Sequence, residues 1–129
     1  MRLSPRFSLL ILFVATSGVG CQRLNHERTI DLNEGDVREI VIDGPRGEQL
    51  VTVSVNADSP VDVHIVLEGD LEKTRNTLMN QKTPTGELAG KRAVRNDSLE
   101  ATIPARSNFA VLLSGARKRT DVKLKIMGR

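Results

Sequence analysis

From Arg28 onward, apolar and polar residues alternate with a period of two, and this pattern restricts the fold more than any other feature. Successive side chains of a β-strand point to opposite faces, so the alternation predicts strands with one buried face. β-Branched residues, which strands prefer, fill many of the apolar positions. The predicted strands carry Ile30 and Leu32; Ile40, Val41 and Ile42; Val51, Val53 and Val55; Val61, Val63, Ile65 and Leu67; Leu99, Ala101 and Ile103; Phe109, Val111 and Leu113; and Val122, Leu124 and Ile126. The chain is therefore predicted to be all-β.

Turn-forming residues separate these strands at residues 33–36, 44–47, 58–60 and 104–108. Short strands with regular turns favour an antiparallel two-sheet sandwich, jelly-roll-like, of about seven to eight strands. Residues 51–67 are predicted to form a central hairpin, because both halves are rich in valine on the inward face.

One segment, residues 70–81, lacks the alternation. Asp70 is a suitable N-cap, and Leu71 and Leu78 predict one short helix there. Because these two leucines are seven positions apart, one helix face can cover an open end of the sandwich. Residues 82–97 are polar and contain one proline and two glycines, which predicts a long loop.

The N-terminal segment has the three parts of a secretory signal peptide. Arg2 and Arg6 are basic, residues 9–15 are apolar, and small residues precede Cys21. The apolar stretch is shorter than the roughly 20 residues that a transmembrane helix needs. We therefore expect export rather than a permanent membrane span.

Cys21 is the only cysteine, so an internal disulfide is excluded. The segment Gly18-Val19-Gly20-Cys21 resembles the lipobox of bacterial lipoproteins, in which the Cys thiol receives a diacylglyceryl group and becomes the mature N-terminus. This resemblance implies that residues 1–20 are a lipoprotein signal peptide, residues 21–27 the lipidated Cys and tether, and residues 28–129 the β-sandwich domain. Gly18 stands where the lipobox usually has Leu, which leaves open cleavage by an ordinary signal peptidase, for example after Ser17, with an ordinary buried or free thiol.

Lipidation would anchor the protein on the periplasmic or outer side of a bacterial envelope. Each buried methylene contributes about 0.8 kcal/mol, so two acyl chains hold a protein stably on a membrane. Gln22 stands where many lipoproteins retained at the inner membrane have Asp, which by resemblance favours the outer membrane. A first strand beginning near Arg28 leaves a tether that reaches no more than about 25 Å.

The composition excludes several classes of partner. The chain has three phenylalanines and no Trp or Tyr, and two of the three, Phe7 and Phe13, lie in the leader. Phe109 alone gives no platform for stacking bases or sugars. The net charge of +3 falls by two when Arg2 and Arg6 leave with the leader. We therefore expect no nucleic-acid partner.

The sequence carries no motif for catalysis, a cofactor or a metal. Gly-x-Ser-x-Gly, a phosphate-binding glycine loop and His-Glu-x-x-His are all absent from the sequence. His64 is predicted on the outward face of its strand, and a solvated surface histidine is preferred over a general base acting beside Asp62. Residues 31–36 fail as a calcium loop, since Asp36 stands at the glycine position and Ile42 at the glutamate position.

The densest charge run, Arg117-Lys118-Arg119, lies between the last two predicted strands. A solvated turn is the simplest interpretation. The alternative is contact with an anionic surface, either lipid headgroups or an acidic partner. Lys91, Arg92 and Arg95 would extend that patch if the predicted loop folds toward the turn.

The C-terminal half consists of a predicted strand over residues 98–103, the pair Pro104-Ala105, an apolar strand over 109–113, a basic turn and a return strand. This order resembles the bacterial pre-peptidase C-terminal type of β-sandwich over residues 28–127, although Phe109-Ala110-Val111 stands where that family often has Tyr. The chain is also similar to small bacterial lipoproteins that combine a leader with one sandwich. The resemblance implies a lipid-anchored, non-enzymatic accessory or protein-binding module of the envelope. The alternative is a small-solute or glycan-binding module.

Overall fold

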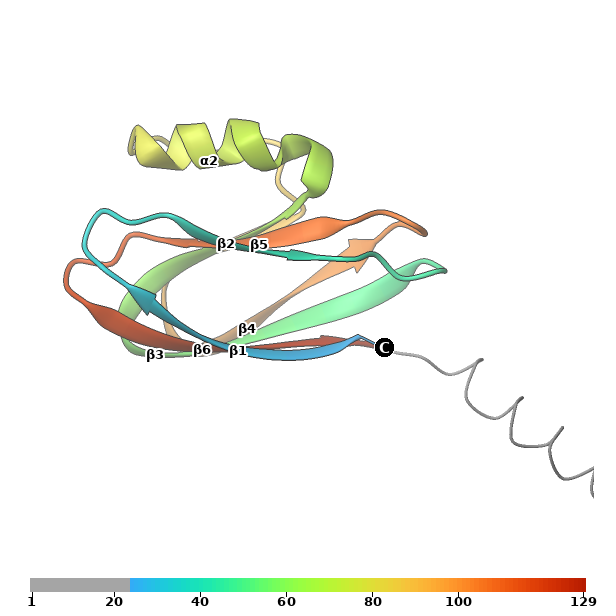
Figure 1. Cartoon of the computed structure of the whole chain (residues 1–129), viewed down its shortest axis with the longest axis horizontal. Coiled ribbons are helices and arrows are strands. Elements are labelled where there is room, and N and C mark those ends of the chain that lie inside the picture. Colours follow the sequence, from blue (N-terminus) through green and yellow to red (C-terminus); the bar gives the residue numbers. More distant parts are fainter. Residues whose placement is uncertain (1–23) are drawn as a thin grey trace, which may run out of the picture.

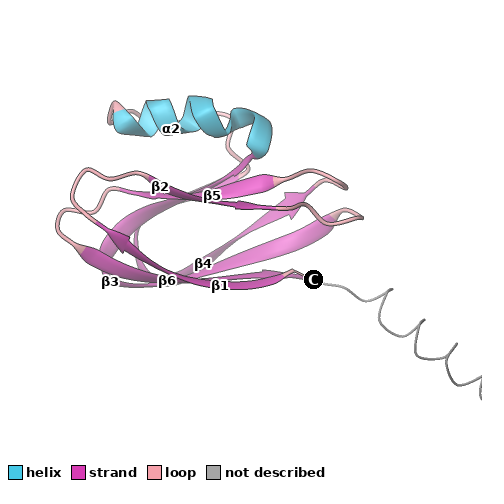
Figure 2. Ribbon diagram, in the orientation of Figure 1, coloured by secondary structure: helices cyan, strands magenta, loops and turns pink. Residues whose placement is uncertain are grey.

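The computed structural model describes residues 24–129, which form two layers of antiparallel β-strands with one helix on the outside (Figure 1, Figure 2). The elements are β1 (Asn25–Leu32), β2 (Arg38–Ile42), β3 (Gln49–Leu67), the 3-10 turn η1 (Glu68–Asp70), α2 (Leu71–Met79), β4 (Ala89–Ile103), β5 (Phe109–Ser114) and β6 (Thr120–Gly128). This architecture confirms the predicted all-β sandwich. The predicted signal peptide and Cys21 lie outside the described residues, and no helix within residues 24–129 is long and apolar enough to cross a membrane.

Two long strands, β3 and β4, run through both layers. The first half of β3 pairs with β6, and β6 pairs with β1, whereas the second half of β3 pairs with β5, and β5 with β2. β4 follows β3 along both halves. We call the β1–β6 side the first layer and the β2–β5 side the second layer.

The predicted hairpin over residues 51–67 is wrong, because these residues form one bent strand. Its two halves do not pair with each other but belong to different layers. Residues 57–60 leave the regular register with β4 between the pairs Asn56↔Asn96 and Val61↔Val94. Pro60 has no backbone N–H to donate, and Asp58-Ser59-Pro60 forms an irregularity where β3 bends from the first layer into the second instead of closing a paired hairpin.

The predicted loop over residues 82–97 is also wrong beyond residue 88, where β4 begins. This half of β4 pairs only with β3, so it is an edge strand whose side chains are mostly exposed, Val94 being buried. A bulge at Arg92-Ala93 further breaks the alternation, because these two residues of β4 oppose the single residue Asp62 of β3 between the pairs Val61↔Val94 and Val63↔Lys91.

The core between the layers contains the predicted inward-facing residues. Val51, Val53, Val63 and Ile65 are fully buried there, together with Phe109. All six residues of β5 are buried, because Ala110 and Leu112 face outward from the second layer and are covered by α2.

The helix α2 confirms the prediction for residues 70–81, but it covers the outer face of the second layer rather than an open end (Figure 1). Leu71 and Leu78 pack in a small cluster with Val66, Ala110 and Leu112. Burying this face keeps the helix on the sheet.

A polar contact also holds α2 to the sheet. The Arg75 guanidinium donates two hydrogen bonds to the Glu39 carboxylate of β2, one of them from Nε at 2.6 Å. Glu39 raises the pKa of Arg75 by hydrogen bonding and by charge attraction.

Candidate functional site

The sandwich has two distinct ends. The Gly128 N–H donates to the Leu24 carbonyl at 2.9 Å, so the C-terminus lies where the described chain enters β1 (Figure 1). We call this the near end. β1 then runs eight residues, about 25 Å, to the opposite or distal end, where Leu32 pairs with Thr120.

A groove with a volume of about 960 Å³ lies at the distal end. The bend of β3, the bulge of β4 and the turn between β5 and β6 form its walls. We call it the distal groove, and its lining residues are Asp58, Ser59, Pro60, Asp62, Arg92, Ala93, Arg95, Gly115, Arg117 and Lys118.

Hydrogen bonds join the bend of β3 to the turn between β5 and β6. The hydroxyls of Ser59 and Thr120 are 2.5 Å apart, and the Thr120 hydroxyl donates to the Lys118 carbonyl at 2.8 Å. Because this network uses both the donor and the acceptor of the Thr120 hydroxyl, the hydroxyl of Ser59 is the donor between the two. Thr120 is completely buried, so its polar atom requires these partners.

Asp62 joins the other two walls of the distal groove. Its Oδ1 accepts a hydrogen bond from the Ala93 N–H at 3.0 Å, within the bulge of β4. Its Oδ2 lies so close to Gly115 that a Cβ there would overlap the carboxylate. Gly115 also has a φ of 79°, which glycine adopts without strain.

Positive charge predominates in the distal groove. Arg92, Arg95, Arg117 and Lys118 line it, against the two carboxylates Asp58 and Asp62. Within residues 24–129, none of the four basic side chains forms an ion pair, although the Arg95 guanidinium donates to the Asp58 backbone carbonyl at 3.3 Å.

The structure divides the predicted basic patch. Arg117 and Lys118 line the distal groove together with Arg92 and Arg95. Arg119 instead pairs with Asp31 at 3.1 Å, and Lys91 pairs with Asp97 at 2.5 Å. The sequence alone could not separate these residues, because their grouping depends on the bends of β3 and β4.

His64 is buried, and the prediction of a solvated surface histidine is wrong. It does lie on the outward face of β3, but its Nδ1 is 2.5 Å from Glu87 Oε2 in the segment between α2 and β4. Gly90 stands opposite His64, and a Cβ there would overlap the Glu87 carboxylate. The absence of a side chain at residue 90 therefore lets Glu87 reach His64.

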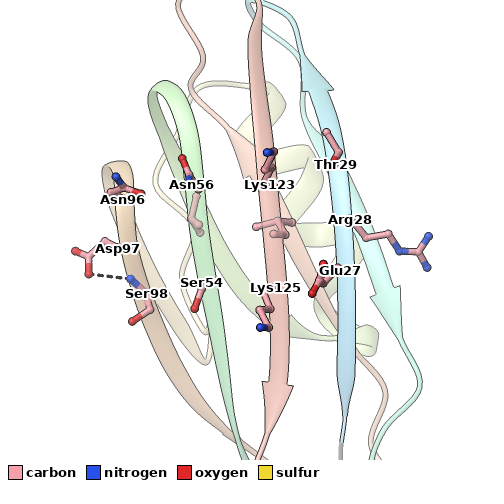
Figure 3. A pocket seen from close by; sticks show the side chains of 12 residues that line it. Glu27, Arg28, Thr29, Ser54, Asn56, Asn96, Asp97, Ser98, Lys123 and Lys125 are labelled. Atoms are coloured by element: carbon pink, nitrogen blue, oxygen red, sulfur yellow. Dashed lines mark hydrogen bonds between the residues drawn. The ribbon is translucent and has the colours of Figure 1, made fainter.

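A second groove, of about 770 Å³, lies on the outer face of the first layer. The registers of four strands place Thr29, Lys123, Asn56 and Asn96 in one row across this face. Lys125, Ser54 and Ser98 form part of the next row, and the side chains are drawn in Figure 3. We call this surface the sheet-face groove; it offers hydroxyl, amide and ammonium groups but no aromatic ring.

Two carboxylates stand directly opposite each other beside this face, Asp31 on β1 and Asp121 on β6. The hydrogen bond and the charge repulsion from Asp31 raise the pKa of Asp121. The same hydrogen bond and the Arg119 guanidinium lower the pKa of Asp31. Within residues 24–129, no group of three His, Cys, Asp or Glu side chains is arranged to hold a metal ion.

No protein-family model and no curated protein sequence matches the chain. Among solved structures it is similar to PliG, a periplasmic inhibitor of g-type lysozyme from Aeromonas hydrophila, with a TM-score of 0.50, 11% identity, and coverage of 85% of this chain and 89% of that one. It is also similar to a protein of the disulfide-linked pili of Bacillus endospore appendages (TM-score 0.48, 13% identity, 83% and 86% coverage). A third is the carbohydrate-binding module CBM36, in complex with calcium and xylotriose (TM-score 0.39, 8% identity, 83% and 98% coverage). At these identities the likeness concerns the fold alone, a β-sandwich.

Proposed function

We propose that this chain is a lipid-anchored, non-enzymatic binding module of the bacterial envelope, and that it holds a protein partner at its distal end. One observation carries the proposal. The described chain enters at the near end, whereas the groove in which basic side chains from β4 and the β5–β6 turn converge lies at the opposite end.

Lipidation of Cys21 would place the near end at the membrane. Only three peptide units separate Cys21 from Leu24, a span of at most about 10 Å. The distal groove lies about one strand length, roughly 25 Å, further along the sandwich. An anchored module of this shape would present the groove to proteins rather than to its own membrane.

The comparisons support this proposal only through the fold. PliG is a periplasmic protein that inhibits a lysozyme, so a β-sandwich of this kind can serve as a protein-binding module in the envelope. The resemblance to pre-peptidase C-terminal sandwiches implies the same class of accessory role. The sequence also carries no Gly-x-Ser-x-Gly, phosphate-binding glycine loop or His-Glu-x-x-His.

Crosslinking in bacterial cells tests the proposal. A photo-reactive amino acid would replace Lys118 in the distal groove of the full chain, or Ser54 in the sheet-face groove as a control. We expect position 118 to crosslink to a defined envelope protein and position 54 not to. Equal crosslinking from both positions, or none from position 118, would remove the support for a binding role at the distal end.

Location is tested separately by mass spectrometry. The intact mass of the membrane-extracted protein should exceed that of the polypeptide from Cys21 by a lipid moiety, and Cys21→Ser should abolish this increment. An unlipidated mass in the parent protein would show that the anchor is absent.

A small-solute or glycan-binding module is the second candidate, and the sheet-face groove favours it. Its rows of hydroxyl, amide and ammonium groups can hydrogen-bond to a polyol. A saturable rise in melting temperature with one member of a glycan library, lost in Lys123→Ala, would support this candidate over protein binding.

A further inference from the structure

We infer that the distal groove binds a carboxylate-rich segment of a partner protein rather than the headgroups of a membrane. This inference rests on the proposed function and names the chemistry of the partner. It draws on the charge of the groove, its rigidity, its shape and its distance from the near end.

The charge of the groove favours an anion. Arg92, Arg95, Arg117 and Lys118 outnumber the two carboxylates that line the same space. Asp62 is already engaged with the Ala93 N–H, so its carboxylate is partly neutralised by a donor of the protein itself. Guanidinium groups match carboxylates in geometry and can donate two parallel hydrogen bonds to one of them.

The groove is built before any partner arrives. The Ser59–Thr120 hydrogen bond connects the bend of β3 to the end of the β5–β6 turn, and the Asp62–Ala93 hydrogen bond connects β3 to the bulge of β4. Ala93 has a φ of 55°, which a residue with a Cβ adopts only where its surroundings hold it there. A backbone fixed in this way loses little conformational entropy on binding.

The shape and position of the groove favour a peptide segment over a bilayer. A concave space of about 960 Å³ can admit a few side chains of a protruding loop, whereas a membrane presents a broad surface. The surface potential of a membrane decays within a Debye length, about 8 Å at physiological ionic strength. At roughly 25 Å from the near end, the groove would lie beyond that field in the anchored protein.

Peptide binding by the purified full chain in detergent tests this inference. The probe is a fluorescently labelled hexaglutamate peptide, measured by anisotropy, with hexaglutamine as the uncharged comparison. We expect saturable binding of hexaglutamate only, weakening as salt is added. The triple variant Arg92→Ala/Arg117→Ala/Lys118→Ala should weaken that binding by about tenfold or more.

A matched control removes three positive charges elsewhere. Arg28, Lys123 and Lys125 all line the sheet-face groove, and their triple replacement by Ala should leave hexaglutamate binding within about twofold of the parent. Thermal melts of both variants establish that each is folded before binding is compared. If both triple variants lose binding equally, net charge rather than the groove attracts the peptide, and the inference is wrong.

The remaining outcomes distinguish an acidic peptide from a lipid headgroup as the anion that the groove binds. Absence of hexaglutamate binding, or equal binding of hexaglutamine, overturns the inference. So does groove-dependent binding of phosphatidylglycerol vesicles by the chain without hexaglutamate binding, because the anion would then be a lipid headgroup. The proposed function is tested separately by crosslinking. A protein crosslinked from position 118 would still support a partner at the distal end even if the acidic peptide did not bind.

Discussion

The carboxylate of Asp62 accepts a hydrogen bond from the backbone N–H of Ala93 at 3.0 Å, and this contact fixes the bulge at which β4 passes between the two layers. Ala93 has a left-handed backbone there, and Arg92 beside it lines the distal groove. A single side chain of β3 therefore shapes both the bend of the sandwich and the wall of the candidate site.

Replacing Asp62 should loosen this bend. Asp62→Ala removes the acceptor of the Ala93 N–H, so we expect the free energy of unfolding to fall by about 1 kcal/mol. Asp62→Asn keeps an acceptor oxygen in the same place, so its free energy of unfolding should fall by less. Urea denaturation of the two variants measures the difference, and an Asp62→Ala protein as stable as the parent would show that the hydrogen bond does not hold the bulge.

Gly90→Ala should separate Glu87 from His64. A Cβ at residue 90 overlaps the Glu87 carboxylate, and displacing that group leaves the buried Nδ1 of His64 without its partner. An unpaired buried polar group costs about 1–3 kcal/mol, which thermal or urea denaturation detects.

Gly47→Ala is the control for that variant, because a Cβ at residue 47 meets nothing within 4 Å. It should change the free energy of unfolding by less than about 0.5 kcal/mol. In a Glu87→Ala background, Gly90→Ala should cost little, since the overlapping group is gone. A full cost in that background would mean that Gly90 matters for another reason.

The apposed carboxylates of Asp31 and Asp121 predict a pH-dependent effect on stability. Asp31 raises the pKa of Asp121, so the folded state binds this proton more tightly than the unfolded state does. The contribution of Asp121 to stability is therefore present at low pH and is lost as pH rises through its folded pKa. Asp121→Asn should raise the melting temperature at pH 7 more than at pH 3. A change of the same size at both pH values would contradict the repulsion between the two carboxylates.

Packing of α2 on the second layer predicts a contrast between two apolar residues of the helix. Leu71 is buried against the sheet, whereas the side chain of Met79 is 63% exposed. We expect Leu71→Ala to lower the free energy of unfolding by about 2 kcal/mol and Met79→Ala by less than about 0.5 kcal/mol. Equal effects in denaturant titrations would show that the helix does not depend on this contact.

The sequence correctly predicted those strands in which the order of apolar and polar residues reflects only which face is buried. Val51, Val53 and Val55 alternate because one face of β3 is buried and the other is not. The apolar run of β5 is continuous because both of its faces are covered, by the core and by α2. Such patterns are local and can be read along the chain.

The bends and the candidate site could not be predicted in this way. Residues 58–60 have the composition of a hairpin turn. Only the pairing of the two halves of β3 with different strands, β6 and β5, shows that these residues join the two layers instead. The exposed edge half of β4 has the polarity of a loop. His64 and Glu87 are 23 residues apart, and no spacing rule connects them.

The central claim is that the chain is anchored at one end and exposes the distal groove at the other. Fluorescence quenching by spin-labelled lipid headgroups tests it most directly, in the full acylated chain on phosphatidylethanolamine–phosphatidylglycerol vesicles. Cys21 is the only cysteine and its thiol would carry the lipid, so Lys118→Cys or Thr102→Cys each gives a single site for a fluorophore. Thr102 pairs with Leu50 at the start of β3, beside the near end. We predict strong quenching at position 102 and little at position 118. Quenching at position 118 equal to or stronger than that at position 102 would contradict the account.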